Sequence, residues 1–257
     1  LSHTSGIADY FEQKPTQGKS LAEMVLENQD RSWSFDDILA HVRKNLRPRF
    51  DPDAGRGFYS DTNYQLLGRI IESLSGENFN DILGKKILQP LGLNKTFMFA
   101  PEMLNRYPGI LPLYHDDQRL VIPQAMASFG CDGGMVSTTG DMLRFLEAFF
   151  TGKLFEPSWI QTAAEWRRIF FPLQYGVGFM RFQLPRIFTL FRKTPEFFGH
   201  SGASGTVAFY APELDLYVCA AVNQTKYRDL PFRLLVEAGM AAARFRESSA
   251  GSAQQRY

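Results

Sequence analysis

Apolar residues in the first two thirds of the chain recur at the three- and four-residue spacing of amphipathic helices. One run follows Ser34, and Asp37 three residues later completes the capping-box pattern that starts a helix. Another run follows Asp61 and stops at Gly76, which suits a helix C-cap. Further helices are predicted after Asn78, after Thr138 and from about Asp229 to Phe245.

These runs also predict which apolar residues share a helix face. The face of the helix after Asp61 carries Leu67, Ile70, Ile71 and Leu74, the buried stripe after Asn78 is Phe79, Ile82, Leu83 and Ile87, and the last helix turns Leu234, Leu235, Ala238, Ala241 and Phe245 inward.

Strand patterns lie late in the chain, where aromatic and β-branched residues are concentrated. The predicted strands are Tyr175–Phe182, Thr206–Tyr210 and Leu216–Val222, and a turn at 211–215 joins the last two as a hairpin. Helices first, then an antiparallel sheet and a closing helix, predict an α+β fold.

The order of these elements also predicts how the chain divides. We expect a single domain over residues 1–247, helical to about residue 165, with the sheet and closing helix over 166–247. The polar, small-residue end at 248–257 is predicted to be a flexible tail.

Charge and composition exclude several classes of function. The 28 Lys and Arg residues nearly balance 27 Asp and Glu residues, so the clustered basic excess of a nucleic-acid-binding protein is missing. Neither a signal-peptide nor a transmembrane pattern occurs in the sequence. The four histidines form no H-x-x-x-H pair and no glycine-rich phosphate loop is present, so we expect neither a metal nor another cofactor.

A serine flanked by glycines, at Gly199–Ala203, nearly matches the nucleophile elbow of α/β-hydrolases. That layout needs a histidine after the serine and the acid, and His200 is the last histidine of the chain. Ser201 is therefore excluded as a nucleophile of this kind.

Five segments together resemble a different design, that of the β-lactamase-related serine hydrolases, which include class C β-lactamases, D-peptidases and esterases. In chain order they are Leu1–Gly6 (LSHTSG), Tyr59–Tyr64 (YSDTNY), Gly130–Thr139 (GCDGGMVSTT), Tyr175–Gly178 (YGVG) and Gly199–Gly202 (GHSG). The resemblance implies an antiparallel sheet flanked by helices plus a helical subdomain, as in penicillin-binding proteins. It also implies an acyl-enzyme mechanism.

The chain departs from this family in one respect, because no serine is followed by lysine three positions later. The family's nucleophile belongs to such a Ser-x-x-Lys segment, placed before the LSHTSG turn. The chain begins at Leu1 rather than Met, and we therefore expect the N-terminal part of the domain to be missing here. The alternative is a truncated, inactive relative.

The resemblance implies catalytic roles for Tyr59 and His200, which we expect to face each other across one cleft. A phenol has an ordinary pKa of about 10, so Tyr59 needs a cationic neighbour to act as a base. His200 stands where β-lactamases carry lysine, and as a mostly neutral side chain it can relay a proton to Tyr59. The other readings are a turn tyrosine and a buried histidine held by a backbone carbonyl.

The same resemblance implies substrate contacts at Asp61, Ser201, Gly202 and Ala203. Gly202 lets substrate approach, and the Ala203 N–H corresponds to the family's oxyanion donor. Asp61 replaces an asparagine and, when ionised, can only accept hydrogen bonds. Together with His200 it favours esters or D-amino-acid-type substrates over β-lactams, although Asp61 can equally be the N-cap of its helix.

Residues 166–193 combine six cations with six phenylalanines and contain no acid. One interpretation is a cationic, apolar lip that contacts acyl chains or anionic lipid. We favour the other, a hairpin whose phenylalanines are core and are covered by arginine stems.

The sequence thus predicts a serine hydrolase acting on a small ester or amide, complete only with an upstream Ser-x-x-Lys. The alternative hypothesis is a non-catalytic family member that binds peptide or lipid in the same cleft.

Overall fold

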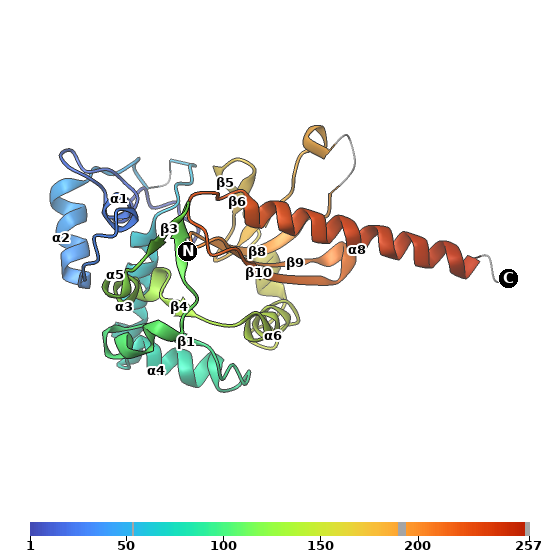
Figure 1. The fold of residues 1–257 in the computed structure, drawn as a ribbon, viewed down its shortest axis with the longest axis horizontal. Coiled ribbons are helices and arrows are strands. Elements are labelled where there is room, and N and C mark those ends of the chain that lie inside the picture. Colours follow the sequence, from blue (N-terminus) through green and yellow to red (C-terminus); the bar gives the residue numbers. More distant parts are fainter. Residues whose placement is uncertain (53, 190–193, 255–257) are drawn as a thin grey trace. The chain divides into compact units, whose positions relative to one another are not determined.

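The computed structural model describes residues 1–52, 54–189 and 194–254. The chain forms two compact units, Leu1–Phe145 and Leu146–Tyr257, with helix α6 (Thr139–Phe150) running through the boundary (Figure 1).

Unit 1 is mainly helical. Its helices are α1 (Leu21–Leu26), α2 (Phe35–Asn45), α3 (Asp61–Ser75), α4 (Phe79–Leu83) with the π-helix η1 (Gly84–Leu88), the 3-10 helix η2 (Pro101–Gly109), α5 (Pro123–Ser128) and the 3-10 helix η3 (Gly130–Asp132). Two small antiparallel ribbons complete it, β1 (Phe97–Met98) with β4 (Met135–Val136) and β2 (Leu113–His115) with β3 (Gln118–Leu120).

Helix α2 starts as its sequence predicts. The Ser34 hydroxyl accepts the Asp37 N–H at 3.2 Å, and the Asp37 carboxylate accepts the Ser34 N–H at 2.8 Å. This reciprocal capping box satisfies N–H groups that a helix start otherwise leaves free, and such a cap is worth ~1 kcal/mol. Gly76 ends α3 in the left-handed conformation, with its N–H donating to the carbonyl of Glu72.

The prediction that the apolar residues of α3 face inward is wrong. Leu74 is 83% exposed, and Ile70 and Ile71 are exposed too. The buried residues of α3 are instead Thr62, Asn63, Gln65 and Gly68. The N-terminal segment bonds to Thr62 and Asn63, and the segment 129–132 covers Gln65 and Gly68. The predicted stripe of α4 is only half-buried.

The core of unit 1 is an aromatic cluster around Tyr10 and Trp33, which lie on different segments but pack edge to face with centroids 6.2 Å apart. Phe129 packs edge to face on Trp33 at 5.6 Å. The cluster fixes the segment before α1, which has no regular secondary structure, against α2 and α5.

Unit 2 is a six-stranded antiparallel sheet in the order β10-β9-β8-β7-β6-β5. Its strands are β5 (Arg167–Phe170), β6 (Leu173–Tyr175), β7 (Met180–Phe182), β8 (Phe197–Gly202), β9 (Thr206–Ala211) and β10 (Leu216–Ala221). The remaining elements are α7 (Ser158–Thr162), the 3-10 helices η4 (Arg186–Thr189) and η5 (Pro212–Leu214), and α8 (Leu230–Gln254).

One predicted strand, Tyr175–Phe182, is two strands. The chain turns between β6 and β7, where Gly176 N–H donates to the Phe179 carbonyl and Gly178 takes φ +86°. A left-handed residue of this kind ends a strand, and glycine adopts it without steric cost.

Both faces of the sheet are covered. On one face Phe232 of α8 packs on Phe209 and Phe182, with ring centroids 6.3 and 4.9 Å apart. On the other face, Phe150 of α6 packs on Tyr210 at 5.1 Å. Side chains of neighbouring strand residues point to opposite faces, so Phe209 and Tyr210 meet different helices.

The inward face of α8 differs from the predicted one. Leu235 is fully buried, but Leu234, Ala241 and Phe245 are exposed. Gly239 packs so closely on the Phe197 ring that a Cβ there would lie 2.6 Å from it.

Helix α8 also runs beyond its predicted end at Phe245 and reaches Gln254 (Figure 1). The predicted flexible tail at 248–257 therefore begins inside this helix, and residues 255–257 lie outside the described residues. In the part of the chain that the structure describes, no helix is both long and apolar enough to cross a bilayer.

Candidate functional site

The predicted site residues fall into two groups, one in each unit. Tyr59 and Asp61 lie in unit 1, while His200, Ser201, Gly202 and Ala203 lie in unit 2. Each group is a half-site that its own unit assembles. The expectation that Tyr59 and His200 face each other stays a prediction.

In the first half-site, the LSHTSG turn holds Tyr59. The His3 ring stacks on the Tyr59 ring with centroids 4.3 Å apart. His3 Nδ1 accepts the Ser60 N–H at 3.1 Å, and the His3 carbonyl accepts the Phe58 N–H at 2.9 Å. His3 itself has φ +54° and is buried. It thus fixes the backbone on both sides of Tyr59.

Further hydrogen bonds join the first ten residues to the start of α3. Thr62 Oγ1 donates to the Ala8 carbonyl at 2.7 Å and accepts the Tyr10 N–H at 3.0 Å. Ser5 Oγ donates to Asn63 Oδ1 at 2.7 Å. Two motifs far apart in the sequence therefore form one rigid assembly.

Asp61 is not the N-cap of α3, which corrects one of its two predicted roles. The N-cap is Ser60, which makes no side-chain capping bond because its hydroxyl donates to the Ala8 carbonyl instead. Asp61 is the first helical residue, and its N–H donates to Asp9 Oδ2 at 3.1 Å. The carboxylate that serves this helix start comes from Asp9, and the Asp61 side chain is left to bond the Tyr59 hydroxyl.

Three carboxyl groups gather around this helix start, on Asp9, Asp61 and Asp132. Burial raises the pKa of Asp61 well above its usual value, and the neighbouring Asp9 and Asp132 raise it further. Burial also raises the pKa of Asp132 to about 8, although Gln65 Nε2 donates to its Oδ2 at 3.1 Å. Burial, followed by the charge of Asp61, raises the pKa of Tyr59 as well.

The chemical consequence is that burial favours the protonated, neutral forms of these acids and of Tyr59. Buried carboxyl groups that share one site hold on to protons, because two adjacent negative charges repel each other in a poorly solvated environment. Tyr59 stays protonated unless a cation approaches. Among the described residues, no group of three or more His, Cys, Asp or Glu side chains is arranged to hold a metal ion.

In the second half-site, His200 is held on β8 through both ring nitrogens. Nδ1 lies 2.7 Å from the Ser201 carbonyl, which can only accept, so Nδ1 carries a proton. Nε2 lies 3.0 Å from the hydroxyl of Tyr175, which is fully buried. In the neutral ring Nε2 accepts from that hydroxyl. Burial lowers the pKa of His200, which favours this neutral form.

The residues after His200 form the hairpin between β8 and β9. Gly202 pairs with Thr206, and a Cβ on Gly202 would lie 2.3 Å from Thr206 Oγ1. A larger residue at this position would therefore displace the Thr206 side chain, in addition to hindering the predicted approach of substrate. Ser201 Oγ contacts Met180 Sδ at 3.5 Å, and Ala203 is exposed in the turn.

Sequence reasoning missed Asp9 and the role of Tyr175. Asp9 follows the LSHTSG motif without belonging to it, so no pattern marks it. Tyr175 belongs to the YGVG segment, so the motif marks the residue, but it does not predict the hydrogen bond to His200.

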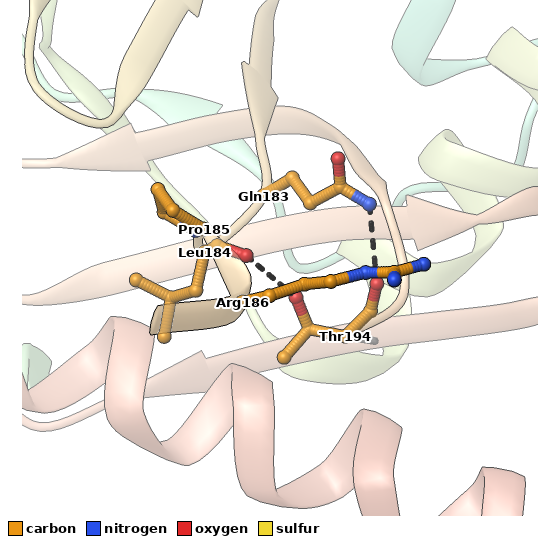
Figure 2. Close-up of a pocket in the computed structure, with 5 residues that line it drawn as sticks. All are labelled: Gln183, Leu184, Pro185, Arg186 and Thr194. Atoms are coloured by element: carbon orange, nitrogen blue, oxygen red, sulfur yellow. Dashed lines mark hydrogen bonds between the residues drawn. The ribbon is translucent and has the colours of Figure 1, made fainter. Parts of the chain in front are cut away.

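A pocket of about 280 Å³ lies elsewhere, lined by Gln183, Leu184, Pro185, Arg186 and Thr194 (Figure 2). Gln183 Nε2 donates to the Thr194 carbonyl, and Thr194 Oγ1 donates to the Leu184 carbonyl, both at 3.2 Å. These polar groups satisfy one another, and none of the predicted site residues lines the pocket.

Comparison with known proteins shows the family to which the chain is similar. The model of the Beta-lactamase family matches residues 1–239. Penicillin-binding protein 4* of Bacillus subtilis is 30% identical over 164 residues, covering 58% of this chain and 34% of the relative. A putative D-alanyl-D-alanine carboxypeptidase of Escherichia coli is 24% identical over 244 residues, covering 82% and 53%. The chain thus spans about a third to a half of these curated relatives.

Solved structures share the fold. D-amino acid amidase from Ochrobactrum anthropi superposes with a TM-score of 0.73 at 22% identity, covering 96% of this chain and 70% of that one. D-stereospecific amidohydrolase from Streptomyces sp. gives 0.66 at 23% identity, covering 88% and 67%. The similarity confirms the predicted α+β class with an antiparallel sheet flanked by helices, as in penicillin-binding proteins.

Proposed function

The chain belongs to the Beta-lactamase family, and on that premise we propose that the protein is a serine hydrolase that cleaves a small amide or ester through an acyl-enzyme. The observation that carries this proposal is the assembly around Tyr59. The LSHTSG turn stacks His3 on the Tyr59 ring and fixes the backbone beside it. A phenol held this firmly is suited to move a proton.

The proposed nucleophile is the serine of a Ser-x-x-Lys segment outside residues 1–257, where no serine has lysine three positions on. Its lysine ammonium would offset the burial and negative charge that raise the pKa of Tyr59. Each unit by which the lysine lowers the pKa of Tyr59 corresponds to ~1.4 kcal/mol of stabilisation of the phenolate.

In this mechanism the serine oxygen bonds to the substrate carbonyl carbon while its proton passes to the Tyr59 phenolate. Tyr59 then gives that proton to the leaving amine or alcohol as the scissile bond breaks. Backbone N–H groups, with Ala203 contributing one, hold the oxyanion. Water releases the acyl group by the same route.

The substrate class follows from His200. A neutral imidazole that donates to Ser201 and accepts from Tyr175 gives no positive charge to a substrate carboxylate. Penicillins carry such a carboxylate, whereas amino acid amides and simple esters do not require the contact. The solved relatives that act on amides support this choice, since they are named D-amino acid amidase and D-stereospecific amidohydrolase.

The test is Tyr59→Phe in the full-length protein, assayed with D-alanine p-nitroanilide and p-nitrophenyl butyrate. Removing a proton-transfer group lowers kcat by ~10²-fold or more. The matched control is Tyr114→Phe on the small ribbon of unit 1, which leaves kcat unchanged. Equal kcat in the Tyr59 variant and the parent enzyme would refute the proposal.

The absence of Ser-x-x-Lys from residues 1–257 favours a second candidate, a non-catalytic member that binds peptide or lipid in the same cleft. The two candidates separate in one experiment. A fluorophosphonate probe adds its mass to the full-length protein if that protein is a serine hydrolase and leaves the mass unchanged if it only binds.

A further inference from the structure

Unit 2 carries an exposed apolar surface made of Phe170, Phe171, Ile187 and Phe188, here named the aromatic tip. These side chains are 48%, 59%, 71% and 63% exposed. The first two lie at the turn between β5 and β6, and the others lie on η4, in the excursion between β7 and β8 that projects from the sheet (Figure 1). The Phe171 and Phe188 rings are 5.9 Å apart, so the two segments are neighbours.

The exposure of the aromatic tip corrects the interpretation that the phenylalanines of residues 166–193 are core. That interpretation holds for Phe179 and Phe182, which are buried. Phe191 lies outside the described residues. Single exposed apolar side chains are ordinary, but four on two adjacent segments, with two of the rings 5.9 Å apart, are typical of an interaction site.

The charged residues of the two segments that carry the aromatic tip have one sign. Arg168 and Arg186 are exposed beside it, and neither forms an ion pair within the described residues. The sequence contains no Asp or Glu between Glu165 and Glu196, and these two acids pair with Arg167 and Arg181. The aromatic tip is therefore apolar at its centre and cationic at its edge.

We propose that the aromatic tip docks on an anionic lipid surface. Phenylalanines enter the boundary between headgroups and acyl chains, while arginines pair with lipid phosphates. A second copy of this chain fits less well, because a two-fold contact would place the same arginines opposite each other without an acid to compensate. The docking requires no membrane-spanning segment.

The experiment is flotation of the full-length protein with vesicles of phosphatidylcholine alone or with about a third phosphatidylglycerol. We expect binding to the anionic vesicles. Phe171→Ser with Phe188→Ser, and separately Arg168→Gln with Arg186→Gln, should each reduce the bound fraction by ~10-fold. The control is Leu74→Ser, which removes an even more exposed apolar side chain from unit 1 and leaves binding unchanged.

A second readout does not depend on loss of binding. Phe171→Trp should show a blue shift of tryptophan emission when anionic vesicles are added, and Leu74→Trp should show none. The proposal is overturned if the parent protein stays with the unbound fraction, or if it binds both kinds of vesicle equally. It is also overturned if only an acidic protein, and no vesicle, is bound through Arg168 and Arg186.

Discussion

Replacing Tyr175 by Phe tests how His200 is held in its proposed neutral form. The substitution removes one hydroxyl from a fully buried ring and creates no clash. That hydroxyl lies 3.0 Å from His200 Nε2. A neutral hydrogen bond contributes ~1 kcal/mol, and a buried acceptor that loses its donor costs ~1–3 kcal/mol. We expect the free energy of unfolding to fall by about 1–3 kcal/mol.

The assay is urea unfolding of Tyr175→Phe, with Tyr210→Phe as the control on the same sheet. The Tyr210 hydroxyl bonds Asp215 at 3.3 Å at the surface, where water can replace the partner. Its loss should change the stability by less than ~0.5 kcal/mol. If both substitutions lower the free energy of unfolding equally, the buried hydrogen bond to His200 contributes no more to stability than the surface bond to Asp215.

The histidine tautomer gives a separate check of the same reasoning. Nitrogen chemical shifts of ¹⁵N-histidine-labelled protein should show His200 neutral at about pH 7, with the proton on Nδ1. The tautomer should persist in Tyr175→Phe, because the Ser201 carbonyl still accepts from Nδ1. A proton found on Nε2 in the parent protein would refute the assignment of both hydrogen bonds.

Three further predictions concern charge, packing and specificity. Because the pKa of Asp132 is raised to about 8, the folded protein loses stability as pH rises from about 4 to about 8. Asp132→Asn should therefore raise the free energy of unfolding by roughly 2 kcal/mol or more at about pH 8 and by less at about pH 5, measured as urea midpoints. Gly199→Ala places a Cβ 2.0 Å from the Ala208 carbonyl oxygen and should cost at least ~3 kcal/mol, whereas Gly84→Ala meets no atom and should stabilise its helix by ~0.5–1 kcal/mol in the same thermal-unfolding assay. In the full-length enzyme, kcat/KM should favour p-nitrophenyl butyrate over nitrocefin, and His200→Lys should shift that ratio toward nitrocefin; a parent enzyme that prefers nitrocefin would contradict the substrate class inferred from His200.

Local signals predicted the helix starts, because a capping box involves only neighbours in the sequence. Ser34 with Asp37 is such a case, and it is confirmed. The inward face of α3 could not be predicted in this way. Its buried residues are polar or small: Thr62 and Asn63 bond to the N-terminal segment, and Gln65 bonds to Phe129 and Asp132. Apolar spacing therefore identified the helix but not its orientation.

In the candidate site, too, some residues could be predicted from the sequence and others could not. Tyr59 and His200 stand in motifs, so their positions could be read from the sequence. Asp9, which bonds the Asp61 N–H beside Tyr59, and Tyr175, which bonds His200, come from other segments and reach the site only through tertiary packing. Such contacts have no local pattern, and a hydrogen-bond network of this kind can be recognised only once the fold is known.

The neighbouring acids change the hydrogen-bonding capacity of the Asp61 side chain. An ionised aspartate only accepts hydrogen bonds, and on that ground it was expected to disfavour substrates that an asparagine would recognise. Burial, together with Asp9 and Asp132, raises the pKa of Asp61 well above its usual value and so favours the neutral form of this group. A neutral carboxyl group offers one donor and one acceptor, as an amide side chain does. A protonated Asp61 therefore no longer disfavours β-lactams, and the proposed preference for esters or D-amino-acid-type substrates depends on His200.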